Sequence, residues 1–93
     1  MAYAAGWLSL RVLEESKLNS AKSFLISIPK KKVPLAVRRN RIRRVLREAL
    51  RMHPVFQGNS KTFSFYVLRD PRSLSLREAS DLLDQLSKHA NLQ

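Results

Sequence analysis

The sequence has no cysteine, only two histidines and only two glycines among its 93 residues. Without cysteine, the chain can form neither a disulfide framework nor a thiolate metal site. Two glycines are too few for a phosphate-binding glycine loop, and no zinc-hydrolase or nucleophile motif is present. No apolar run approaches the roughly 18 residues of a membrane span, and the first residues lack the positive start of a secretory signal. We therefore expect a cytoplasmic protein with no membrane anchor and no catalytic residues of its own.

Positive charge is what the chain has in excess, with a formal net charge of +11. The 22 residues from Lys30 to Arg51 hold ten basic side chains and one acidic one, whereas the other 71 residues hold eight basic and six acidic ones. A block this concentrated is the usual electrostatic footprint of a nucleic-acid site, so the expected partner is a polyanion. The length predicts a single domain, residues 1–93, with one small core.

The basic block predicts an amphipathic helix from Pro34 to about Met52. Its apolar residues recur at steps of three and four and cover one arc of the helix; they are Ile42, Val45, Leu46, Ala49 and Leu50. Six polar residues occupy the opposite arc, with Arg41 at its edge; they are Arg39, Asn40, Arg43, Arg44, Arg47 and Arg51. Arginines four residues apart repel each other by a few tenths of a kcal/mol per pair. A helix that keeps this repulsion is expected to place the arginines against phosphates.

The rest of the chain completes a predicted order of β-β-α-β-α. Alternating residues predict strands over 7–13 and 23–28, joined by a hairpin connection, and Pro29 ends the second strand or places it at a sheet edge. A third strand is predicted over 62–68, and Ser75 with Glu78 matches a capping box that opens a last helix. Two helices on one face of a small sheet would form an α+β fold.

The run from Lys30 to Ala49 resembles the protein subunit of bacterial ribonuclease P. The family signature is matched by Lys31-Lys32-Val33, Arg39-Asn40-Arg41, Arg43-Arg44 and Arg47-Glu48-Ala49. The resemblance covers about Trp7 to Leu92. It implies helices packed on a central sheet with a left-handed β-α-β crossover, against a general right-handed preference of about 98%. It also implies that the family's N-terminal helix is missing, because only six residues precede Trp7; truncation and loss in this lineage both remain open.

The same resemblance implies a function, the removal of the 5′ leader from precursor tRNA by hydrolysis of one phosphodiester. The RNA subunit of that enzyme holds the active site and its Mg²⁺ ions, whereas the protein binds this RNA and contacts the leader; no small-molecule cofactor is implied. The RNA-binding positions carried over by the motif are Lys31, Lys32, Arg39, Asn40, Arg41, Arg43, Arg44 and Arg47. Leader contacts are expected from aromatic side chains on the open sheet face; the candidates are Trp7, Phe24, and either Phe65 or Tyr66.

Two other functions are compatible with the basic block. One is a non-enzymatic, ribosome-associated RNA-binding domain of similar topology. The other is a basic module that binds acidic proteins or membrane surfaces, which usually requires a wide exposed apolar face that a small domain needs for its core. If the chain makes six phosphate contacts, as the resemblance to the ribonuclease P protein implies, its binding constant K for RNA should depend on salt. A plot of log K against log salt concentration should have a slope of about −4 to −5.

Overall fold

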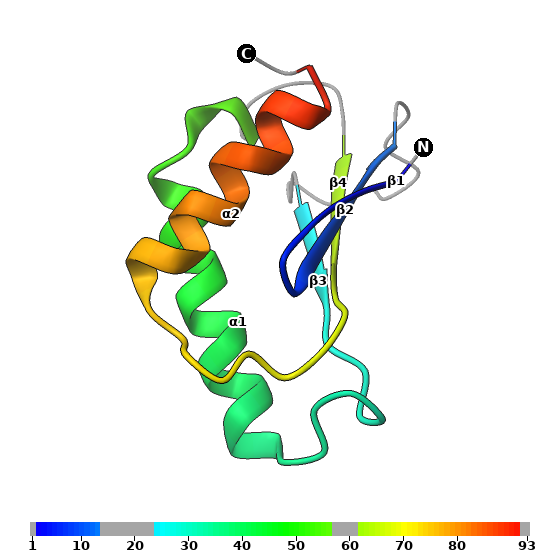
Figure 1. The fold of residues 1–93 in the computed structure, drawn as a ribbon, viewed down its shortest axis with the longest axis vertical. Helices are drawn as coiled ribbons and strands as arrows, with labels where there is room; N and C mark the ends of the chain where they lie inside the picture. Colours follow the sequence, from blue (N-terminus) through cyan, green and yellow to red (C-terminus); the bar gives the residue numbers. More distant parts are fainter. Residues whose placement is uncertain (1, 14–23, 57–61, 92–93) are drawn as a thin grey trace.

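The computed structural model describes residues 2–13, 24–56 and 62–91. They form an α+β fold in which a four-stranded mixed sheet carries two helices on the same side (Figure 1). The strands are β1 (Ala2–Ala5), β2 (Leu8–Leu13), β3 (Phe24–Ser27) and β4 (Thr62–Val67). The helices are α1 (Ala36–Arg51), a short 3-10 turn (Pro54–Phe56) and α2 (Leu76–His89).

The strand order in the sheet is β1-β2-β4-β3. The β1–β2 and β2–β4 pairs are antiparallel, whereas β3 and β4 are parallel and are joined through α1. The predicted hairpin between 7–13 and 23–28 is therefore wrong, because β4 lies between these two strands. β4 takes the centre because Phe63, Phe65 and Val67 line its core face and are fully buried there. The connecting residues 14–23 lie outside the described residues.

Strand β1 was not predicted, and it occupies the positions before Trp7. It pairs with β2 through a two-residue hairpin loop in which Gly6 has a φ of 57°. Such loops need a residue with positive φ at this position, and glycine supplies it without steric cost. The short Ala-Tyr-Ala-Ala stretch has little strand signal of its own, so only its pairing with β2 makes it a strand.

One hydrophobic core joins the helices to the inner sheet face. Leu8 and Leu10 from β2 and Phe63 and Phe65 from β4 meet the buried side chains of both helices. Those helical side chains are Ile42, Leu46, Ala49 and Leu50 from α1 and Ala79, Leu82, Leu83 and Leu86 from α2. Phe56 closes the core, with its ring edge-on to Phe63 at 5.2 Å and to Phe65 at 5.4 Å between ring centroids. Burying each large side chain stabilises the fold by about 1.5–3 kcal/mol.

Three local predictions are confirmed. β3 lies at a sheet edge and ends at Ser27, two residues before Pro29. The predicted basic helix is present as α1, and the predicted apolar arc is the side that faces the core. The hydroxyl of Ser75 accepts a hydrogen bond from the backbone N–H of Glu78 at 3.1 Å, which is the N-cap half of the predicted capping box. The Glu78 carboxylate instead accepts from the indole of Trp7.

Candidate nucleic-acid interface

The surface of α1 that faces away from the sheet is formed by arginine. Arg41, Arg44, Arg47 and Arg51 are exposed, and Arg43 is half-buried. With Asn40 they make up what we call the basic face of α1. Because Ile42, Leu46, Ala49 and Leu50 are buried on the other side, the rotation of the helix is fixed by the core. The core therefore determines where the guanidinium groups point.

Most of these guanidinium groups have no acidic partner. Arg51 pairs with Glu48 at 3.2 Å, and both side chains are more than half exposed. Arg43 reaches only the amide oxygen of Asn40, at 3.5 Å. Among the described residues, no carboxylate forms an ion pair with Arg41, Arg44 or Arg47. Exposed pairs such as Arg51–Glu48 contribute little, so nearly the whole positive charge of this face is open to a ligand.

Arg39 differs from the arginines of the basic face. It is half-buried, and its Nη1 donates hydrogen bonds to the backbone oxygens of Val33 at 2.9 Å and Pro34 at 2.8 Å. The preceding turn is closed by hydrogen bonds from the backbone nitrogens of Lys32 and Val33 to the oxygen of Pro29. Arg39 thus holds the turn that presents the exposed Lys31 and Lys32 at the start of α1.

A groove separates α1 from the edge strand β3. Arg43 and Arg47 line one side of it, and Phe24, Leu25 and Ile26 line the other. Phe24 is half-buried and packs against the core. The groove therefore combines two cations with apolar side chains. Proteins that bind single-stranded nucleic acid use this combination.

The outer face of the sheet carries no helix (Figure 1). Tyr66 is its one aromatic residue among the described strands and is 40% exposed, with Ser9 and Ser27 opposite it on the neighbouring strands. Trp7 is only 3% exposed and Phe65 only 1%, since both belong to the core. Of the predicted leader contacts, Tyr66 therefore lies on the open face, Phe24 lies at the α1 groove, and the ring of Trp7 is inaccessible to a base.

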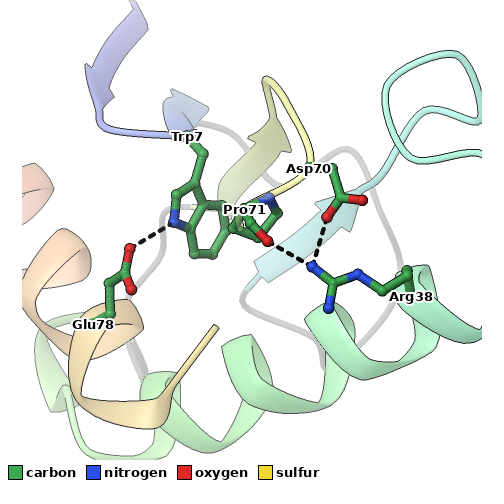
Figure 2. A network of polar contacts seen from close by, with 5 residues as sticks. All are labelled: Trp7, Arg38, Asp70, Pro71 and Glu78. Atoms are coloured by element: carbon green, nitrogen blue, oxygen red, sulfur yellow. Dashed lines mark hydrogen bonds and ion pairs between the residues drawn. The ribbon is translucent and has the colours of Figure 1, made fainter. Parts of the chain in front are cut away.

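A polar network that sequence reasoning missed ties α1 to the loop of residues 68–75 between β4 and α2. Figure 2 shows Arg38 donating from Nη2 to the carboxylate of Asp70 at 2.7 Å and to the backbone oxygen of Pro71 at 2.5 Å. The indole Nε1 of Trp7 donates to the Glu78 carboxylate at 3.3 Å. Arg38 and Asp70 are 32 residues apart, so no local pattern signals their contact.

The described residues offer neither a metal centre nor a membrane-spanning helix. No group of three or more His, Asp or Glu side chains is placed to hold an ion within residues 2–13, 24–56 and 62–91. Over the same ranges, neither helix combines the length and apolar character needed to cross a bilayer.

Comparisons with known proteins point to one family. The family model for ribonuclease P matches residues 3–91. Ribonuclease P protein components from Vibrio cholerae serotype O1 strains are 32% identical over 85 residues, which are 91% of this chain and 71% of theirs. The fold is similar to the structure of the Staphylococcus aureus ribonuclease P protein, with a TM-score of 0.73 at 20% identity, covering 99% of this chain and 82% of that one. A second structure of that protein, a mutant with defective mRNA degradation activity, gives a TM-score of 0.72 at 20% identity and covers 98% and 75%.

Proposed function

The chain belongs to the bacterial ribonuclease P protein family, subunits of a tRNA 5′-maturation endoribonuclease that assist 5′ processing of precursor tRNA, and we propose that the basic face of α1 binds the RNA subunit. The observation that carries this proposal is the set of exposed arginines without acidic partners. A planar guanidinium makes two parallel hydrogen bonds to one phosphate, which lysine cannot do. Three further cations would extend this surface to the N-terminal end of α1; they are Lys31, Lys32 and Arg39.

We place the chemistry of cleavage on the RNA subunit. The described part of this chain has no group of three or more His, Asp or Glu side chains placed to hold a metal ion. Mg²⁺ would be held by the RNA, where it would activate water and stabilise the leaving oxygen. The protein's own contribution is then electrostatic, because its arginines neutralise phosphates that otherwise repel the approach of precursor tRNA.

The 5′ leader is proposed to cross the open sheet face at Tyr66. Stacking of a base on an exposed aromatic ring is worth about 1–3 kcal/mol and tolerates any base. Arg11 is exposed on the same face of β2, two residues from Ser9, and supplies a cation for the leader backbone. Phe24 lies in the groove beside Arg43 and Arg47, where an RNA strand bound to α1 would meet its edge.

We also propose the hand of one crossover connection and the location of the protein. The β3-α1-β4 unit joins parallel neighbours, and the family resemblance implies a left-handed crossover for it. We propose a cytoplasmic location from the role in processing precursor tRNA.

Reconstitution tests the proposed function directly. The chain is added to a ribonuclease P RNA of a related bacterium, and cleavage of precursor tRNA is measured at low Mg²⁺. We expect cleavage to rise when the wild-type chain is added and not when Arg41, Arg44 and Arg47 are all changed to Gln. A control variant removes two positive charges elsewhere, with Arg77→Gln and Lys88→Gln on α2, and should keep most of the stimulation. No stimulation by the wild type, with tight binding to ribosomal RNA instead, would overturn the proposal.

A further inference from the structure

A second hollow lies where β4 ends and α2 begins, away from the basic face of α1. It is lined by Trp7, Arg69, Asp70, Pro71, Arg72, Ser73 and Glu78. At first sight its charges cancel, because two arginines face two carboxylates. The hydrogen bonds show that they do not act as pairs. The charge of Asp70 is balanced by Arg38, which lies outside the lining, whereas the neutral indole of Trp7 leaves Glu78 charged. Arg69 and Arg72 therefore exceed the remaining acid of the hollow by one positive charge.

Both carboxylates of the hollow are engaged by donors that lie outside its two arginines. Asp70 accepts a hydrogen bond from Arg38 of α1 at 2.7 Å, and its side chain is 41% exposed against 29% for that of Arg38. Glu78 accepts from the buried indole of Trp7 at 3.3 Å. Figure 2 shows these contacts on opposite sides of Pro71, which lies between them. Each acid is therefore held to the fold by a contact that joins two distant segments.

Arg69 and Arg72 are exposed and have no such contact. Within the described residues, neither forms an ion pair or a side-chain hydrogen bond. They lie in a loop that is held against α1, because Arg38 of α1 donates a hydrogen bond to the backbone oxygen of Pro71 in that loop. Because the loop backbone is anchored, binding a ligand with two anionic groups would have to order only the two arginine side chains and not the loop itself.

Arg38 of α1 joins the hollow to the helix, because it contacts Asp70 and Pro71 of the lining. Arg38, Arg41 and Arg44 follow one another at steps of three residues, and residues three apart are neighbours on a helix. Arg38 is the member that contacts the loop, whereas Arg41 and Arg44 are exposed. A chain of phosphates bound to the basic face can therefore pass Arg41 and reach the loop.

We propose that Arg69 and Arg72 form a second phosphate-binding patch for RNA, positioned beside α1 by the Arg38–Asp70 contact. This inference rests on the proposed function of α1 and adds two phosphates to its footprint. Arg38 acts here as a positioning residue, because its guanidinium is occupied by Asp70 and Pro71. Asp70, although acidic, is expected to favour RNA binding because it fixes the loop.

The salt dependence of binding to ribonuclease P RNA tests the patch. The Arg69→Gln/Arg72→Gln variant should flatten the slope of log K against log salt by about 1.4–1.8, since each lost phosphate contact removes about 0.7–0.9. The loss of affinity relative to the wild type should therefore be roughly 30-fold larger at 0.1 M salt than at 1 M salt. The control variant, Arg77→Gln/Lys88→Gln, removes the same charge from α2 and should change the slope by less than half as much. Equal changes in the two variants would overturn the patch.

The Asp70→Asn variant tests the positioning step. It raises the net positive charge by one, so simple electrostatics predicts tighter binding to RNA. The Arg38–Asp70 contact predicts weaker binding, by several-fold, with circular dichroism confirming that the fold is kept. Unchanged or tighter binding would overturn the role of Asp70. The Arg41/Arg44/Arg47 variant is measured in parallel, because a loss there without a loss at Arg69 and Arg72 refutes only this inference, whereas no loss in either refutes the proposed function as well.

Discussion

The two helices pack on the same sheet face but use charge in opposite ways. α2 begins with a side-chain cap from Ser75 and carries Glu78 in its first turn and Lys88 and His89 in its last. These charges complement the helix dipole. α1 has no side-chain cap and no acid in its first turn, and Arg38 and Arg39 lie where the dipole disfavours cations.

The two helices also differ in how charges are paired along each helix. In α2, Asp84 pairs with Lys88 at 3.2 Å, four residues on. In α1, Arg43, Arg47 and Arg51 follow at steps of four and repel one another. The repulsion amounts to a few tenths of a kcal/mol per pair, whereas each large buried side chain stabilises the fold by about 1.5–3 kcal/mol. Core burial is therefore large enough to hold α1 in place despite the repulsion between its exposed arginines.

The buried side of α1 gives the largest expected effect. Leu46→Ala should lower the free energy of unfolding by about 2–5 kcal/mol, because it leaves a cavity in a fully packed site. Leu46 is 1% exposed. Urea denaturation followed by circular dichroism measures the change. A loss below 1 kcal/mol would mean that core packing does not hold α1 in place.

The exposed side of α1 should show the reverse pattern. Changing Arg41, Arg44 and Arg47 to Gln should weaken binding to ribonuclease P RNA about 100-fold at 0.1 M salt, because three phosphate contacts are lost. The free energy of unfolding should stay the same or rise slightly as repulsion is relieved. Filter binding and urea denaturation measure the two quantities. A variant that loses stability and affinity together would contradict the separation of the two sides.

The cap of α2 should affect stability alone. Ser75→Ala removes the hydroxyl that accepts from the N–H of Glu78 and should lower the free energy of unfolding by about 1 kcal/mol. Ser75→Asp, which keeps an acceptor, serves as the control and should retain most of the stability. The salt slope for RNA binding should match that of the wild type. A flattened slope in the Ala variant would place α2 within the RNA interface.

The smallest expected effect has the opposite sign. Arg47→Glu places an acid four residues from both Arg43 and Arg51 and should raise the free energy of unfolding by a few tenths of a kcal/mol. The same change should reduce affinity for RNA, since it introduces a negative charge into the basic face. Thermal denaturation measures the first effect, with Arg47→Gln as control. Lower stability in the Glu variant would show that Arg47 has a structural role.

Features set by local periodicity could be predicted from the sequence. The apolar positions of α1 and the spacing of Ser75 and Glu78 define which side of each helix is buried and where α2 begins. The central position of β4 and the pairing of β1 with β2 depend on contacts between distant segments, so local patterns could not show them. The same holds for the site, where the basic face was predicted but the contact of Arg38 with Asp70 and the burial of Trp7 were not.

The salt dependence of RNA binding by the wild-type chain tests the central claim most directly. Binding to ribonuclease P RNA is measured between 0.05 and 0.5 M KCl, and log K is plotted against log salt. If the arginines of α1 neutralise phosphates, the slope should be about −4 or steeper, and changing Arg41, Arg44 and Arg47 to Gln should reduce it by about 2. A wild-type slope near zero, or one that these three substitutions leave unchanged, would contradict the account.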